Sequence, residues 1–445
     1  MAVCVIGAGL AGCEAAWQIA KRGVGVDLYE MKPIQYSPAH HLSTLAEMVC
    51  SNSLKAMTLD NASGLLKEEM RRMDSIILKC ADENSVPAGG ALAVDREKFS
   101  QSVTCAIENH PLINVIRKEV TSIDEQMSGY DAVIIATGPL TSDTLAAQLQ
   151  EKGLALLKFF DAAAPIIMED SIDHTKVFKA ARYGKGSDDY INCPMNKEQY
   201  LAFYDALIHA KTAEVHDFDN SCVYEGCMPV EVMASRGIDT LRFGPLKPVG
   251  LNNPETGEEY YAVCQLRQDN SEGTMFNMVG FQTRLTFGEQ KRIFGMIPGL
   301  ENAEFARYGV MHRNTYINAP GNLDETYLVK KSLENTPLFF AGQITGVEGY
   351  IESASSGLVA GINAARLVKK EDKLVFPPST MIGALASYAA NYQGSDYQPM
   401  GANFGIVKHN IGPTICIDGK KKKIGKTEKK QLISESALNI LSTIN

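Results

Sequence analysis

Three glycines near the amino terminus have the spacing of a phosphate-binding turn. Gly7, Gly9 and Gly12 follow an apolar run at residues 2–6 and open a helix-forming stretch. In such a motif the first glycine makes the tight turn, the second lets backbone approach a pyrophosphate, and the third lets the helix pack on the strand. The N–H groups and the dipole at the helix N-terminus favour the diphosphate. The residues predicted to form this site are Gly7, Ala8, Gly9, Leu10, Ala11 and Gly12.

An acidic residue completes the motif. A second apolar run, residues 24–29, ends at Glu30. A carboxylate at the end of this strand accepts hydrogen bonds from the ribose hydroxyls of FAD or NAD and repels the 2′-phosphate of NADP. Strand, turn, helix, strand and acid occur in order, so the sequence predicts a dinucleotide-binding unit.

The cysteines are a second group able to do chemistry. The chain has ten, without a C-x-x-C pair or a His/Cys cluster at zinc spacing, so we expect no structural metal. In a reducing compartment most of them should be buried core residues. Cys50 lies in a polar stretch before Ser51, and Cys227 follows Gly226 in a segment able to present a thiol.

Later segments return to the same sheet. Residues 131–139 read as a buried strand ending in a turn at Gly138, and residues 336–346 read as another strand followed by Gly342 and Gln343. The sequence between them changes to mixed strands and helices. We therefore predict an α/β protein, a Rossmann-like FAD-binding domain with an inserted mixed α/β domain. The predicted limits are 1–157 for the first part of the FAD-binding domain, 158–300 for the inserted domain, and 301–445 for the second part with a basic C-terminal segment.

Composition sets broad limits on location and partners. The 445 residues are 45% hydrophobic and 21% charged, which is ordinary for a globular protein. The sequence contains no apolar run of the roughly 20 residues that span a bilayer and no signal peptide, so we expect no membrane partner and a cytoplasmic location. The net charge is −9, but lysines gather between 420 and 430, where a solvated tail or a phosphate-binding patch is possible.

Longer strings carry a family resemblance. Residues 47–54, 87–96, 224–234 and 346–354, taken in order, resemble the folate- and FAD-dependent RNA (uracil-5-)-methyltransferases of TrmFO type, relatives of the GidA-like flavoproteins. The resemblance covers nearly the whole chain. It implies methyl transfer to carbon 5 of a uridine, usually position 54 in the T-loop of tRNA. It also implies 5,10-methylenetetrahydrofolate as carbon donor and FAD reduced by NADPH or NADH.

The resemblance also implies roles for particular residues. Cys50 and Cys227 match the candidate catalytic cysteines of the family, and which of them attacks the base stays open. Tyr350 either stacks on the flavin or pterin or packs as a core aromatic. Gly89, Gly90 and Gly349 would lie near the flavin. Basic residues that could follow RNA are dispersed, among them Lys55, Lys67, Arg71, Arg72, Arg236, Arg242, Lys247, Arg284, Lys291 and Arg292.

Other functions remain open at this stage. One branch of the resembled family acts on 23S rRNA, and these motifs do not separate the two RNA substrates. The glycine motif alone also suits a small-molecule FAD oxidoreductase, although the chain has no second G-x-G-x-x-G for a pyridine nucleotide. A flavin-containing subunit with a structural role is a third possibility. The oligomeric state is not predicted.

Overall fold

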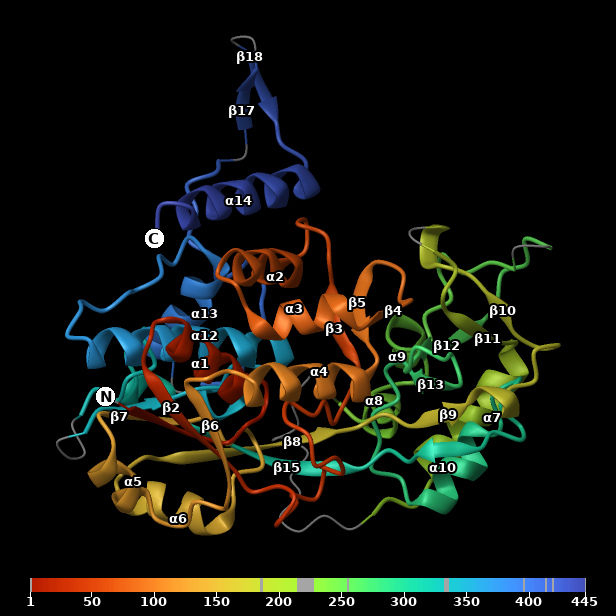
Figure 1. The fold of residues 1–445 in the computed structure, drawn as a ribbon. Coiled ribbons are helices and arrows are strands. Elements are labelled where there is room, and N and C mark those ends of the chain that lie inside the picture. Colours follow the sequence, from red (N-terminus) through yellow and green to blue (C-terminus); the bar gives the residue numbers. More distant parts are fainter. Residues whose placement is uncertain are drawn as a thin grey trace.

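The structure is a computed structural model of the 445-residue chain (Figure 1). It describes residues 2–184, 187–213, 228–253, 256–331, 336–394, 397–412, 414–417 and 420–444. Side chains are not described at 158–161, 312–313, 414–417 and 420–423.

A parallel sheet with the strand order β16-β7-β1-β2-β6 forms the centre of the larger part of the molecule. Its strands are short and almost wholly apolar, because both faces of a parallel sheet are covered by helices. Val5 of the first strand lies between Leu28 and Ile134 of its neighbours. The strands are β1 (Ala2–Ile6), β2 (Gly25–Glu30), β6 (Ile113–Arg117), β7 (Ala132–Ile135) and β16 (Leu338–Phe340).

Two helices far apart in sequence pack against each other beside this sheet. A Cβ on Gly357 would lie 2.2 Å from the Ala11 carbonyl oxygen, and one on Gly361 would lie 2.6 Å from that of Ala15. These glycines therefore allow the close contact between α1 and α12. The helices around the sheet are α1 (Leu10–Lys21), α4 (Arg96–Glu108), α5 (Ile123–Gly129), α6 (Asp143–Glu151) and α12 (Tyr350–Val368).

A layer of helices and a small antiparallel sheet lie over α1 and α12 (Figure 1). The Glu69 carboxylate accepts hydrogen bonds from the backbone N–H groups of Met381 and Ile382, both at 2.8 Å, at the start of one of these helices. The elements are α2 (Ala62–Arg72), α3 (Ile76–Glu83), α11 (Ala319–Asn322), α13 (Met381–Asn391) and α14 (Lys426–Leu441), with β3 (Ser53–Ala56), β4 (Ser85–Val86) and β5 (Ala91–Val94). A hairpin of β17 (Thr414–Ile417) and β18 (Lys420–Lys423) projects beyond α14 (Figure 1).

The smaller part of the molecule has its own antiparallel sheet, in the order β10-β11-β12-β13-β9-β14, and its own core. Phe203, Phe281 and Phe294 are fully buried there. The strands are β9 (Ile166–Met168), β10 (Phe178–Lys179), β11 (Ile191–Met195), β12 (Ala262–Gln268), β13 (Met275–Met278) and β14 (Phe305–Arg307). The helices are α7 (Lys197–Ile208), α8 (Val230–Ser235), α9 (Thr240–Phe243) and α10 (Phe287–Phe294).

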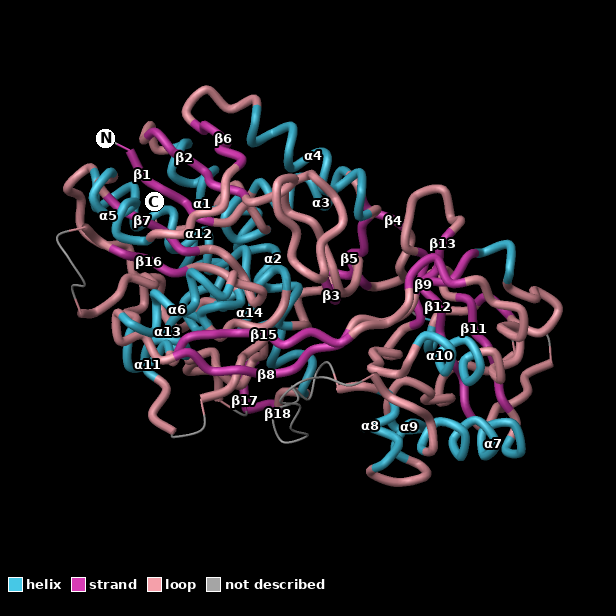
Figure 2. Tube along the Cα trace, turned by 90° about the horizontal axis from the view of Figure 1, so that it is seen from below, coloured by secondary structure: helices cyan, strands magenta, loops and turns pink. Residues whose placement is uncertain are grey.

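A two-stranded ribbon connects the two parts. The antiparallel strands β8 (Leu156–Ala162) and β15 (Met311–Ile317) carry the chain into and out of the smaller part (Figure 2). The core of that part runs from Ile167 to Ala303. We keep the name inserted domain for residues 163–310, which lie between the two strands.

The predicted fold class is confirmed: an α/β architecture with a parallel, Rossmann-like sheet and a mixed α/β insertion. None of the helices in the described part of the chain combines the length and apolar character needed to cross a bilayer. The described residues also contain no cluster of His, Cys, Asp and Glu suited to a metal ion.

Candidate active site

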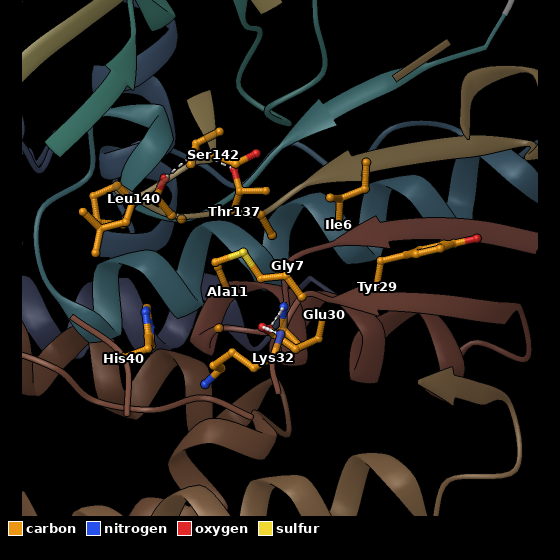
Figure 3. A pocket seen from close by; sticks show the side chains of 18 of the residues that line it. Ile6, Gly7, Ala11, Tyr29, Glu30, Lys32, His40, Thr137, Leu140 and Ser142 are labelled. Carbon is orange, nitrogen blue, oxygen red and sulfur yellow. Dashed lines mark hydrogen bonds between the residues drawn. The ribbon is translucent and has the colours of Figure 1, made fainter. Parts of the chain in front are cut away.

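A pocket opens where β1, β2 and β7 end, at the edge of the parallel sheet (Figure 3). Ligands of open α/β sheets bind at this edge because the turns after the strands meet there. Most of the predicted cofactor-binding residues line it. They are Gly7, Ala8, Gly9, Leu10, Ala11, Glu30, Gly138, Gly342, Gln343 and Tyr350.

Each glycine of the first turn has a separate physical role. Gly7 has φ +97°, and a Cβ there would lie 2.6 Å from the Ala136 carbonyl oxygen. A Cβ on Gly12 would lie 1.8 Å from the Gly7 carbonyl oxygen, so the helix packs directly on the turn. A Cβ on Gly9 would meet nothing within 4 Å. Gly9 therefore leaves open space at the helix N-terminus, where a diphosphate needs it.

Glu30 is buried at the end of β2 and holds the turn together. Its Oε2 accepts from the backbone N–H of Ala8 at 3.0 Å, and its Oε1 accepts from that of Lys32 at 3.0 Å. Each carboxylate oxygen can accept a further hydrogen bond. Glu30 can thus bind ribose hydroxyls as predicted, and it also fixes the backbone of the glycine turn.

The pocket contains residues that sequence reasoning missed. Figure 3 shows Lys32 and His40 on one side and Thr137 and Ser142 on the other. Lys32 donates to the carboxylate of Glu47 at 3.2 Å, with both side chains buried. Two features of the sequence could have indicated them: Lys32 lies two residues after the acid, and hydroxyl residues lie on both sides of Gly138.

These residues fit a dinucleotide with an extended ring system. The lining combines a glycine turn at a helix N-terminus, an acid at the end of the second strand and Tyr350 at the start of α12. The turn suits a pyrophosphate, the acid suits a ribose, and the aromatic residue suits a flat ring. FAD has all three groups.

Tyr350 connects this pocket to Cys50. The Tyr350 hydroxyl oxygen accepts from the backbone N–H groups of Cys50 at 2.7 Å and Ser51 at 3.2 Å. Burial raises the pKa of the Tyr350 phenol well above its ordinary value, so the group stays protonated at neutral pH. The predicted ring contact with a cofactor remains a prediction, and the structure adds that the hydroxyl holds the Cys50 loop, residues 48–53.

Arginines hold the same loop from its other side. Arg267 donates to the Ser51 hydroxyl at 2.8 Å and to the Asn52 side-chain oxygen at 3.1 Å. Arg307 donates to the Val49 carbonyl. Both arginines belong to the inserted domain, on β12 and β14. Burial lowers the pKa of both guanidinium groups.

Arg96 completes this group of cations. Its guanidinium pairs with Asp269 of the inserted domain at 2.9 Å, with both side chains buried, and donates to the Met48 carbonyl at 3.4 Å. Among the described residues, the buried Nε atoms of Arg96 and Arg307 have no hydrogen-bond partner. The loop that carries Cys50 thus lies among three guanidinium groups, one of them neutralised by Asp269.

Three glycines assigned through the resemblance do not line the pocket. Gly89 donates its backbone N–H to Asp189 of the inserted domain at 2.9 Å, and Gly90 lies beside it in the β4–β5 turn. A Cβ on Gly349 would lie 2.2 Å from an oxygen of Glu352, which pairs with Lys55 at 2.8 Å. The positive φ angles of Gly89 (+58°) and Gly349 (+117°), together with these contacts, account for glycine at those two positions.

The cysteines separate into core and exposed groups. Burial raises the pKa of Cys4, Cys13, Cys193 and Cys264, and it raises that of Cys80 to about 12. The prediction that most cysteines are core residues is confirmed for these five. Cys50 is half-buried, and Cys222 and Cys227 lie outside the described residues. The structure therefore does not test whether Cys227 approaches Cys50.

Not all of the dispersed cations are available to RNA. Lys67 is fully buried and donates to the Leu54 carbonyl at 2.7 Å, so it cannot reach a phosphate. Arg242 stacks over the ring of Tyr261, 3.7 Å from its centroid. Arg71 pairs with Asp82 at 2.7 Å. The side chains of the lysines at 420–423 are not described.

Comparison with known proteins places the chain in a family. A model of the family "Glucose inhibited division protein A" matches residues 2–372. The methylenetetrahydrofolate–tRNA-(uracil-5-)-methyltransferase TrmFO of Acetivibrio thermocellus is 64% identical over 405 residues, 91% of each chain. The enzyme of the same name from Desulforamulus reducens is 56% identical over 440 residues, 99% of this chain and 96% of its own.

Solved structures support the fold. GidA of Aquifex aeolicus, in its form II crystal, superposes with a TM-score of 0.70 at 16% identity, covering 99% of this chain and 73% of that one. The form I crystal gives a TM-score of 0.66 at 18% identity, covering 88% of this chain and 71% of that one. With the sequence identities above, the chain belongs to the GidA family and, within it, to the methylenetetrahydrofolate–tRNA-(uracil-5-)-methyltransferases of TrmFO type.

Proposed function

We propose that this chain methylates carbon 5 of a uridine in tRNA, taking the carbon from 5,10-methylenetetrahydrofolate and the reducing electrons from NADPH or NADH through FAD. One observation carries the proposal. The pocket with dinucleotide-binding geometry is lined by Tyr350, and the hydroxyl of Tyr350 accepts a hydrogen bond from the backbone N–H of Cys50. A substrate near this cysteine would lie at the mouth of the cofactor pocket.

The residues of the pocket would hold FAD without further rearrangement of the glycine turn. The turn at Gly7–Gly12 would bind the pyrophosphate, and Glu30 would accept from a ribose. When bound, FAD supplies the two electrons that convert a methylene, at the oxidation level of formaldehyde, into a methyl group. Tyr350 closes the end of the pocket next to the Cys50 loop and limits the entry of water.

A cysteine thiolate would make the uracil reactive. Carbon 5 of uracil is a poor nucleophile, and a thiolate that adds at carbon 6 converts the ring to an enolate that attacks through carbon 5. Carbon 5 would bond to the methylene carbon, and loss of the carbon 5 proton would accompany cleavage of the bond between that carbon and its carrier. A hydride supplied by reduced FAD would then convert the methylene into a methyl group, and elimination of the thiolate from carbon 6 would restore the 5,6 double bond. Cys50 and Cys227 are the candidates, with their individual roles open. The guanidinium groups of Arg96 and Arg307 lie against the Cys50 loop and would stabilise the enolate by their positive charge, because preorganised charge stabilises charge that develops during the reaction.

The RNA is proposed to be tRNA, with the T-loop uridine at position 54 as target. The base must leave its stack to reach a pocket of this kind. A cytoplasmic location is proposed with this substrate. The inserted domain, which supplies Arg267 and Arg307, would contribute to the substrate side of the site.

The test is transfer of labelled one-carbon units from methylenetetrahydrofolate to unmodified tRNA and, in parallel, to unmodified 23S rRNA fragments, with NADPH or NADH. We expect label at carbon 5 of one tRNA uridine and none from the Cys50→Ala variant, which should still bind FAD. Label in rRNA alone would move the proposal to the other substrate. Yellow protein that oxidises NADPH without labelling either RNA would indicate a small-molecule oxidoreductase.

A further inference from the structure

Three aromatic rings form a ladder at the edge of the inserted domain. The ring of Tyr308 stacks on Phe305, with centroids 4.9 Å apart and planes 11° apart. It also stacks on Phe287, with centroids 4.7 Å apart and planes 16° apart. Aromatic pairs prefer offset-stacked or edge-to-face arrangements, and Phe281 and Phe294 of the same domain show the second kind at 82°. The three rings of the ladder show the first kind twice in succession.

The outer ring of the ladder faces solvent. Phe287 is 55% exposed, although it is a large apolar side chain and the first residue of α10. One of its faces lies on Tyr308, so its exposure comes from the remainder of the ring. Phe305 and Tyr308 are half-buried. The ladder therefore ends in an open flat surface the size of one ring.

The ladder is held rigidly. The buried side chain of Gln290 donates to the Gly309 carbonyl at 2.8 Å and accepts from the Gly309 backbone N–H at 2.8 Å. These two bonds join α10 to the segment that carries Tyr308. Rigid aromatic anchors lose little conformational entropy on binding, which favours a contact surface.

The ladder is connected to the Cys50 loop through one strand. Phe305 and Arg307 both belong to β14 and lie two residues apart, on either side of a shift in the register with β9. Arg307 donates to the Val49 carbonyl, one residue before Cys50. Figure 1 places α10 on the lower side of the molecule, and Figure 2 shows that side with α10 in front of the sheet of the inserted domain.

The charge around Phe287 is suited to a polyanion. Lys211, Lys291 and Arg292 are exposed, and the Thr286 N–H donates to the Lys211 carbonyl at 3.1 Å, which places that lysine next to the start of α10. The acid of the first turn, Glu289, pairs with Arg292 at 2.6 Å. Basic side chains around an exposed aromatic ring are the usual combination for single-stranded nucleic acid.

We infer that Phe287 is a stacking platform for an unpaired base in a loop of the RNA substrate. Proteins read loops of RNA by stacking splayed bases on aromatic side chains. Tyr308 and Phe305 support the platform from behind, and Lys211 and Lys291 face the neighbouring phosphates. The inference rests on the proposed function, since it takes an RNA loop as the substrate.

The test compares Phe287→Ala with Phe287→Tyr in the FAD-loaded, full-length protein. Binding and methylation are measured with unmodified tRNA, and binding is also measured with a T-arm stem-loop and with a blunt duplex of the same stem. Loss of one base stack should weaken stem-loop and tRNA binding about tenfold or more in Phe287→Ala, raising KM while kcat holds. Phe287→Tyr keeps the ring and should bind as the wild type does. Duplex binding should be unchanged in both.

The matched control is Phe243→Ala. Phe243 is 84% exposed on the same domain and makes no ring contact within the described residues, so its removal should leave RNA binding unchanged. The platform would be overturned if Phe243→Ala and Phe287→Ala lost RNA affinity equally. It would also be overturned if Phe287→Ala lost as much affinity for the duplex as for the stem-loop. The platform would also be overturned if Phe287→Ala bound RNA as tightly as the wild type does, provided that the wild type methylates tRNA. A wild type that binds but never methylates RNA would instead overturn the proposed function.

Discussion

The glycine turn at residues 7–12 and the Cys50 loop at residues 48–53 border the same pocket but are positioned by different kinds of contact. The turn is held by neighbours in one βαβ unit, with Glu30 bonded to Ala8 and the helix packed on Gly7. The Cys50 loop is held by Tyr350, Arg96 and two arginines of the inserted domain. Cofactor binding should therefore survive damage to the inserted domain, and methyl transfer should not.

The largest effect should follow from filling the space at Gly9. The Gly9→Leu variant should fold, because a Cβ at this position meets nothing within 4 Å in the protein, and should lose FAD completely because the side chain occupies the pyrophosphate site. Flavin absorbance of the purified protein and its far-ultraviolet circular dichroism measure the two properties. Folded, fully yellow protein would contradict the assignment of the turn.

The next effect concerns the buried pair between the domains. Asp269→Asn leaves the Arg96 guanidinium without its counter-charge in a buried position, which should lower the free energy of unfolding by about 3 kcal/mol. Chemical denaturation of the flavin-free protein measures this. The double variant Arg96→Met/Asp269→Leu should recover most of the loss, and failure to recover would mean that Asp269 acts through its electrostatic attraction for Arg267 and Arg307 instead.

Loss of an arginine from the inserted domain should separate cofactor binding from catalysis. Arg307→Met removes the donor to the Val49 carbonyl and lets the backbone beside Cys50 move. A misplacement of about 1 Å can cost about a hundredfold in rate, so kcat for methyl transfer should fall by about that factor while FAD stays bound. Arg292→Met, an exposed arginine of α10 paired with Glu289, is the control for lost positive charge. A similar fall in both would show that charge alone matters.

The same contrast explains what the sequence could predict. The contacts that hold the glycine turn are made between residues close in sequence, so they leave a fixed spacing. The pocket could therefore be predicted from the spacing of Gly7, Gly9, Gly12 and Glu30. Gly138 and Gly342 followed from the strands that precede them. Except for Arg96, the partners of the Cys50 loop come from residues more than two hundred positions away, such as Arg267, and no local pattern marks them. Lys67 carries a charge typical of the surface, yet the fold buries it beneath β3.

Lys67 supports the strand that follows the Cys50 loop, and its titration should be visible in stability. Burial lowers its pKa from 10.5 to about 8, so the folded protein binds fewer protons than the unfolded chain between these values. Stability should therefore rise as pH increases from about 8 to 10.5. Lys67→Met should remove this dependence of stability on pH. It should also stabilise the protein by about 2 kcal/mol at pH 7, which is the gain from removing the buried charge less the loss of the hydrogen bond to Leu54. The exposed Lys79→Met serves as control and should keep the slope.

The smallest effect should come from Gly89, which the family resemblance placed near the flavin. In the structure its backbone N–H donates a hydrogen bond to Asp189 of the inserted domain, and its φ of +58° favours glycine at this position. A Cβ there would lie 3.5 Å from the ring of Tyr190, an ordinary contact. Gly89→Ala should therefore cost about 1 kcal/mol of stability through backbone strain alone and leave the FAD content at the wild-type level. If this variant instead lost flavin without losing stability, the β4–β5 turn would belong to the cofactor site, and the boundary between the locally built pocket and the contacts of the inserted domain would have to be redrawn.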